Sequence, residues 1–136
     1  MDCRAAMALV DKEQEQVVGL VEDGSLLYAW DIALEPGRGA KELRILPACI
    51  DAFRGGADCK LTWAEVMALL VPARPALTAS EIARTLNASE LHTYSLLRKG
   101  ELHPLSGQRR GPGGSAQVLA YSFGEFLRRR RWPRSD

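Results

Sequence analysis

Long apolar segments are missing from the sequence, because no run of about 18 uninterrupted hydrophobic residues occurs in its 136 residues. A membrane-spanning helix is therefore not expected. The first residues, MDCRAAMALVDKEQ, place an acid at the second position and contain only a short apolar run, so they do not resemble a secretory signal. These features predict a cytoplasmic protein with no membrane partner.

Residues that often carry catalysis or bind metals are also scarce. Three cysteines (Cys3, Cys49 and Cys59) form an odd set that cannot pair completely within the chain, and we expect free thiols with Cys49 buried. Two histidines, His92 and His103, lie in no pattern that links them to a cysteine or a carboxylate. A thiol protease or a zinc site would need ligand spacings that are absent from this set. We therefore expect no enzymatic activity, no metal and no cofactor.

The chain has little net charge as a whole, but its two halves carry net charges of opposite sign. The net charge of +1 hides a division, because residues 1–70 hold seven Lys or Arg against twelve Asp or Glu, a net charge of −5. The rest of the chain holds eleven basic and five acidic residues, a net charge of +6. This asymmetry predicts that the second half meets a polyanion and that the first half has another role.

Residues 77–102 have the pattern of two short helices joined by a tight turn. Thr78 and Glu81 form a T-x-x-E capping box, in which each side chain satisfies an unpaired backbone N–H at the start of the first helix. Asn87 tolerates the left-handed backbone that ends a helix, and Ser89 can cap the next helix. Gly100 predicts the end of the second helix, before an extended run.

These residues carry a resemblance to the winged helix-turn-helix of phage excisionases and MerR-type regulators. The positions that match the family pattern are Leu77, Thr78, Glu81, Ala83, Leu86, Ser89, Tyr94, Leu96, Leu97, Gly100 and Leu102. The family continues with a basic wing, a short strand and a helix that ends in an aromatic residue, for which this chain has residues 109–114, 117–119 and 123–127. The family often has Arg or Lys where this chain has Glu90 and Leu91.

The resemblance implies that the helix from Ser89 enters the major groove of DNA, where its first residues meet base edges. Glu90 can accept a hydrogen bond from cytosine N4, and Leu91 can contact a thymine methyl group. By resemblance, Tyr94 and Arg98 would touch phosphate. The predicted DNA contacts are Ser89, Glu90, Leu91, Tyr94, Ser95, Arg98, Lys99, Arg109, Arg110, Arg128, Arg129, Arg130 and Arg131.

Two groups of predicted contacts lie outside the two helices: Arg109 with Arg110, and the arginines 128–131. Arg109 and Arg110 are placed in a glycine-rich tip, from which long cations can reach the DNA backbone or a minor groove. The tip lacks the Gly-Lys-Ser/Thr of a nucleotide-binding P-loop. The arginines 128–131 follow the last predicted helix without a break, so they would cover one helical turn and contact phosphate.

The first half repeats the apolar pattern of the second at a shift of 76 residues, which places Gly24 on Gly100. Beyond the wing the shift becomes 73, which places Ile45 on Val118. The first half therefore predicts a second helix-turn-helix, with strands at 26–32 and 42–46 and a closing helix at 47–53.

In this first copy, Glu22 and Asp23 stand where the second copy has Arg98 and Lys99. These acids would repel the DNA backbone. We therefore predict that the first copy has lost DNA binding and serves as a protein-contact module, for dimerisation or for a recombinase or phage protein. Its wing, with Arg38, Lys41 and Arg44, leaves a route to DNA.

The predicted fold is α+β and helix-rich, with two tandem winged helix-turn-helix modules that each carry a small antiparallel β-hairpin wing. The modules are residues 1–56 and 77–132, joined by a helix and Pro-rich linker at 57–76 and followed by a tail at 133–136. The linker helix either packs the modules together or is the first core helix of the second one. The resemblance implies a nucleoid-associated, double-stranded DNA-binding protein, an excisionase-like architectural factor or a transcription regulator of a mobile element. The alternatives are a small terminase-like packaging subunit and a protein-interaction adaptor that does not bind DNA.

Overall fold

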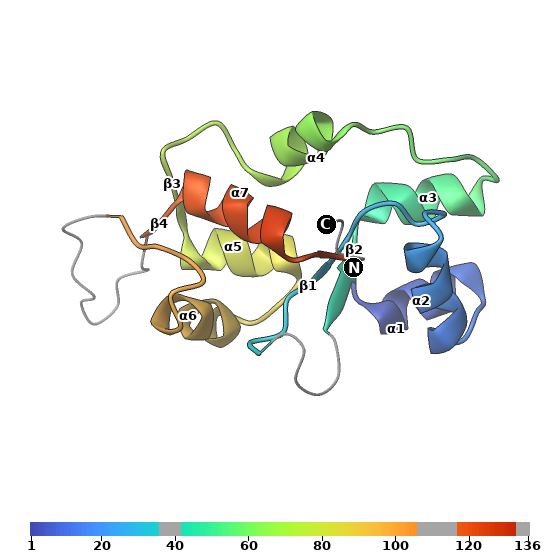
Figure 1. Ribbon diagram of the computed structural model, residues 1–136, viewed down its shortest axis with the longest axis horizontal. Helices are drawn as coiled ribbons and strands as arrows, with labels where there is room; N and C mark the ends of the chain where they lie inside the picture. Colours follow the sequence, from blue (N-terminus) through green and yellow to red (C-terminus); the bar gives the residue numbers. More distant parts are fainter. Residues whose placement is uncertain (36–41, 106–116, 133–136) are drawn as a thin grey trace. The chain divides into compact units, whose positions relative to one another are not determined.

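The computed structural model of the protein describes residues 1–35, 42–105 and 117–132, which fall into two compact units. Unit 1 comprises Met1–Lys60 with Arg130–Asp136, and unit 2 comprises Leu61–Arg129. Within the described ranges the chain forms seven helices and two small antiparallel sheets (Figure 1). The predicted α+β, helix-rich class is confirmed.

Unit 1 consists of three helices and a three-stranded sheet. Its elements are α1 (Cys3–Val10), α2 (Gln14–Glu22), β1 (Ala29–Asp31), β2 (Leu43–Ile45), α3 (Pro47–Arg54) and β5 (Arg131–Trp132). The sheet is antiparallel in the order β2-β1-β5, with Ala29 opposite both Ile45 and Trp132. Helix α1 contacts α2, α3 and β2, and apolar side chains such as Val17, Leu26 and Ile50 are fully buried.

Unit 2 consists of four helices and a two-stranded sheet. Its elements are α4 (Trp63–Leu70), β3 (Ala76–Thr78), α5 (Ala79–Leu86), α6 (Glu90–Arg98), β4 (Gln117–Leu119) and α7 (Ala120–Arg129). Strand β3 pairs antiparallel with β4, which also forms a single bridge through Val118 to Pro104. Phe123, Phe126 and Ile82 are fully buried at its centre. The linker helix α4 is therefore part of unit 2, with Val66 in its buried face.

The local signals that delimit α5 and α6 are confirmed one by one. The Thr78 hydroxyl accepts from the Glu81 N–H at 3.1 Å, and the Glu81 carboxylate accepts from the Thr78 N–H at 2.9 Å. Asn87 is left-handed with φ 52, and the Ser89 hydroxyl accepts from the His92 N–H at 3.1 Å. Gly100 has φ 77, a conformation that residues with a Cβ rarely adopt.

The helices of unit 1 repeat those of unit 2 at the predicted shift of 76 residues. Helix α1 covers 3–10 where α5 covers 79–86, and α2 covers 14–22 where α6 covers 90–98. Asp11, with φ 53, is the counterpart of Asn87, and Gly24, with φ 88, is the counterpart of Gly100. The backbone turns as well as the apolar positions therefore recur.

The strands repeat in the same way, with the shorter shift of 73 beyond the wing. The Met1 ammonium donates to the Ile45 carbonyl at 3.0 Å and the Met1 carbonyl accepts from the Ile45 N–H, which matches the pairing of Leu77 with Val118. The closing helices begin at residues 47 and 120. The two units thus share one supersecondary arrangement, with β5 as an addition to unit 1.

Two predictions about extended and helical segments need correction. The strands of unit 1 are shorter than expected, and residues 102–105, the described part of the predicted extended run after α6, form no strand. They make one bridge, from Pro104 to Val118, and hydrogen bonds from Leu119 N–H to His103 O, from Leu105 N–H to Gln117 O and from His103 N–H to the Ser122 hydroxyl. The four tail arginines do not continue one helix, because α7 ends at Arg129 and the chain turns into β5. None of the helices in the described ranges is long and apolar enough to cross a membrane.

Candidate nucleic-acid interface

Helix α6 presents a polar outer face because its inner face is committed to the core. Thr93, Leu96 and Leu97 are buried, and α6 packs closely on α5. The predicted contact residues between Ser89 and Lys99 lie away from that inner face. Ser89, Glu90, Leu91, Arg98 and Lys99 are exposed, and Tyr94 and Ser95 are half-buried.

The first turn of this face combines a carboxylate with an apolar side chain. Leu91 is 69% exposed, which makes it one of the most exposed large apolar residues in the described chain. Glu90 beside it is also exposed, in the first helical turn where the helix dipole favours negative charge. The turn thus offers a hydrogen-bond acceptor and a methyl-sized contact but no cation.

Cations gather instead at the far end of α6. The Arg98 guanidinium donates to the Ser95 hydroxyl at 2.9 Å, and Lys99 is the C-cap of the helix. Arg129, from the last turn of α7, donates to the Glu101 carbonyl at 3.0 Å and lies 3.3 Å from the Glu101 carboxylate. This contact brings a third cation to the end of α6.

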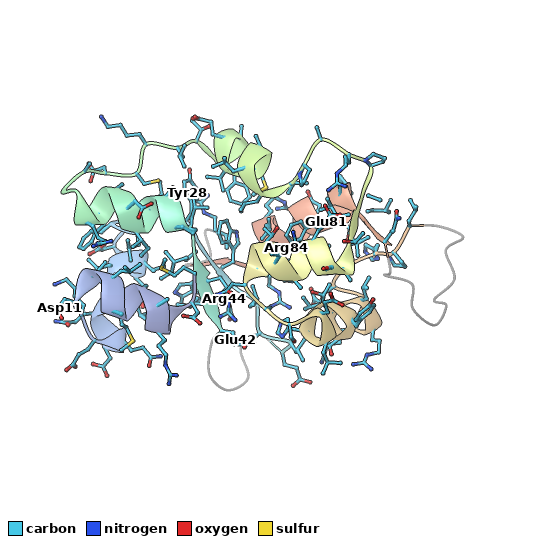
Figure 2. All side chains as sticks on the ribbon, turned by 180° about the vertical axis from the view of Figure 1, so that it is seen from behind. Asp11, Tyr28, Glu42, Arg44, Glu81 and Arg84 are labelled. Carbon is cyan, nitrogen blue, oxygen red and sulfur yellow. The ribbon has the colours of Figure 1, made fainter. Side chains whose placement is uncertain are left out.

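Arg84 and Arg128 are also among the exposed arginines of unit 2. The Arg128 guanidinium lies 2.8 Å from the Glu125 carboxylate, and this partner raises the pKa of Arg128 and lowers the pKa of Glu125. Water screens such an exposed pair, so Arg128 can exchange its partner for another anion. Arg84 was not among the predicted contacts, although it is exposed on α5 one turn after Glu81 (Figure 2). The sequence feature that could have pointed to Arg84 is its place in α5, the first helix of the predicted helix-turn-helix.

The other two tail arginines belong to unit 1, and the prediction that Arg130 contacts DNA is at odds with its place in the structure. Arg130 is only 4% exposed, and its guanidinium donates to the Asp31 carbonyl at 3.0 Å and to the Ala33 carbonyl at 2.7 Å. A side chain fixed in this way has no surface to offer to a phosphate. Arg131, in β5, stacks over the Tyr28 ring at 4.7 Å from the ring centroid.

The wing residues named from the sequence are only partly placed. Arg109 and Arg110 lie outside the described residues, as do Arg38 and Lys41 of the first copy. Arg44 lies in β2, where its guanidinium donates to the Leu43 carbonyl at 3.2 Å (Figure 2).

Helix α2 of unit 1 ends in acids where α6 ends in cations. Glu22 and Asp23 are both exposed. The Asp23 carboxylate accepts from the Ser25 N–H at 2.8 Å, and the hydrogen bonds from Ser25 lower the pKa of Asp23. Asp23 therefore keeps its negative charge at neutral pH.

The charge contrast between the units is smaller than the contrast between the halves of the sequence. Unit 2 contains eight basic and five acidic residues, a net charge of +3, and unit 1 contains ten basic and twelve acidic residues, a net charge of −2. The contrast is smaller mainly because residues 130–136, with three arginines and one acid, belong to the second half of the sequence but to unit 1.

The described ranges contain no group of three or more His, Cys, Asp or Glu side chains that could hold a metal ion. His92 is half-buried on α6 and His103 is exposed. Comparisons of the chain with protein-family models, with curated proteins and with solved structures found no match.

Proposed function

We propose that unit 2 binds double-stranded DNA through the outer face of α6. The observation that carries the proposal is the arrangement of α5 and α6, with a left-handed Asn87 between them and an outer face that ends in Arg98, Lys99 and Arg129. A helix is about 10–12 Å across, which fits a major groove about 12 Å wide. The first turn of α6 would then face base edges, and the cations would face the flanking phosphates.

The two ends of this face should contribute differently to binding, because only one of them carries cations. Glu90 and Leu91 carry no positive charge, so they add discrimination between base pairs but little attraction. The cations at the end of α6 supply the attraction, because each neutralised phosphate releases counterions. Arg84 and Arg128 are further exposed cations that extend the same role. We infer moderate sequence preference on top of salt-sensitive affinity.

We further propose that both units are winged helix-turn-helix modules and that only the second contacts DNA. The repeat of helices, turns and strand pairings supports the shared architecture. The acids Glu22 and Asp23 at the end of α2 support the loss of DNA contact in unit 1. Unit 1 then serves protein contact, in an excisionase-like factor or a regulator of a mobile element, located at the nucleoid.

A titration of a fluorescent random-sequence duplex at about 50 mM and 200 mM salt tests the proposal. We expect micromolar or tighter binding that weakens steeply at the higher salt. The double variant Arg98→Ala/Lys99→Ala should weaken binding to all sequences and reduce the slope of log K against log salt by about 2, since each phosphate contact contributes about 0.9.

The matched control removes two exposed cations from unit 1, through Arg54→Ala/Lys60→Ala, and should leave the salt slope unchanged. Equal losses in the two double variants would mean that net charge, and not the α6 face, drives binding. No binding at low salt would favour the protein-interaction adaptor. The terminase-like alternative also predicts DNA binding, so this titration does not distinguish it from the proposal.

A further inference from the structure

Two cysteines of unit 1 lie against each other although the sequence gives no pairing signal. Cys49 is buried in the first turn of α3, and Cys59 is half-exposed in the segment after that helix. The Cys49 thiol donates to the Cys59 sulfur, and the two Sγ atoms are 3.0 Å apart. Cys3, the third thiol, is half-exposed at the start of α1 and has no such partner among the described hydrogen bonds.

The segment between the two cysteines can accommodate a closer approach. It contains the end of α3 and then Gly55 and Gly56, of which Gly56 has φ +73 and open space around its Cα. A disulfide needs an S–S separation of about 2.05 Å. The sulfurs therefore need to approach by about 1 Å, which a glycine-containing loop allows without a change in the core.

The two thiols differ in reactivity. Burial and the hydrogen bond to Cys59 raise the pKa of Cys49 to about 12, against the smaller opposite effect of the Tyr28 and Leu27 N–H groups. Cys49 is thus almost fully protonated at neutral pH and is shielded from solvent. Cys59 is the accessible member, so an oxidant meets it first.

We propose that Cys49 and Cys59 form a reversible disulfide that serves as a redox modification site in unit 1. With a glutathione-type disulfide as oxidant, the Cys59 thiolate attacks one sulfur, breaks the S–S bond and releases one thiolate. Cys49 then loses its proton to solvent and attacks Cys59 Sγ, which releases the second thiolate. Two protein thiols are oxidised and one small disulfide is reduced to two thiols.

The bond has a defined structural consequence. Cys59 lies one residue before the end of the first segment of unit 1, which runs to Lys60. Oxidation ties residues 55–59 to α3 and so shortens the free chain that leads into unit 2. The site is independent of the proposed DNA contact, because both sulfurs belong to unit 1.

Trypsin provides a direct test because the three cysteines fall in three different peptides. The peptides are Met1–Arg4, Ile45–Arg54 and Gly55–Lys60, which contain Cys3, Cys49 and Cys59 in turn. The native full chain is incubated with oxidised glutathione, its remaining thiols are alkylated in acid-quenched samples, and the digest is analysed by mass spectrometry without reductant. We expect the peptide 45–54 linked to the peptide 55–60, a fall in free thiols from three to one, and loss of the link on reduction.

The controls distinguish a specific disulfide between Cys49 and Cys59 from non-specific oxidation. The Cys3→Ser variant should give the same cross-link, and the Cys59→Ser variant, which changes only a half-exposed residue, should give none. The same treatment in strong denaturant should scatter the links over all three cysteines. The proposal is overturned if native protein yields only glutathione adducts, or if links that involve Cys3 are as abundant as the link between Cys49 and Cys59.

Discussion

Replacement of Arg130 by Met should destabilise unit 1 without a direct effect on DNA binding. The guanidinium donates to two main-chain carbonyls, Asp31 O and Ala33 O, from a site that is 4% exposed. A hydrogen bond from a charged group contributes about 1.5–3 kcal/mol, so the two together contribute about 3–6 kcal/mol. Methionine fills similar apolar volume and removes the cost of burying a charge, which offsets part of that loss. We expect a net loss of about 2–4 kcal/mol.

That loss is large for a unit of this size. Unit 1 has 67 residues (Met1–Lys60 and Arg130–Asp136), and a domain of that length has a stability of about 3–10 kcal/mol. The free energy of unfolding is measured by urea titration with tryptophan fluorescence. In a Trp63→Phe background the remaining signal comes from Trp30 and Trp132, which both belong to unit 1.

The neighbouring arginine provides the control. Arg131 makes a cation–π contact with Tyr28 at a half-exposed position, so Arg131→Met should cost only about 0.5–1 kcal/mol. An unchanged urea midpoint in Arg130→Met would refute the structural role of the guanidinium. A folded Arg130→Met protein that binds DNA as weakly as Arg98→Ala would restore the role in DNA contact that the burial of Arg130 argues against.

Four further outcomes follow from the caps and the thiols. Thr78→Ala removes the N-cap of α5 and should lower the stability of unit 2 by about 1 kcal/mol in urea titrations. The Thr78 N–H and Arg74 lower the pKa of Glu81. The stabilisation that they give is therefore present above about pH 4.5 and is lost as the pH falls through the lower pKa of the folded state. Glu81→Gln should flatten this fall of the unfolding free energy at acid pH, as measured by urea titrations at several pH values. Asn87→Ala should cost about 1 kcal/mol at φ 52, whereas Asn87→Gly should be close to neutral, and equal values would contradict the left-handed turn. Iodoacetamide at pH 8 should leave Cys49 of the reduced protein unlabelled, since its pKa is about 12 and its side chain is buried, and peptide mapping would detect the opposite result.

Much of the local structure was predictable because it depends on neighbouring residues. The Thr78–Glu81 capping box, the Ser89 cap and the glycine at 100 act over three or four positions, and each appears as expected. The outer face of α6 follows from helical periodicity once its buried positions are known. The repeat of unit 2 in unit 1 was predictable from apolar spacing, although Glu22 and Asp23 stand in the copy where unit 2 has Arg98 and Lys99.

The arginine tail shows where such prediction stops. A run of four arginines after a helix is equally compatible with one more helical turn and with a turn into a strand, because composition does not distinguish them. The outcome depends on the Asp31 and Ala33 carbonyls, which lie 99 and 97 residues away along the chain. The contact between Cys49 and Cys59 was also hidden, since the path of the segment after α3 is set by packing and not by a turn motif.

The position of β5 has a consequence for the order in which the chain acquires its structure. Strand β5 pairs with β1 through Ala29 and Trp30, yet it is synthesised after the whole of unit 2. On the ribosome, the later unit therefore has all of its residues available before the earlier one does. The sheet of unit 1 cannot be completed until Trp132 has emerged from the exit tunnel, so one edge of β1 stays unpaired until then. An unpaired strand edge is a site at which chains can pair wrongly and aggregate. A chain truncated after Arg129 contains all of unit 2 but lacks β5, so it should expose the open edge of β1 to chaperones.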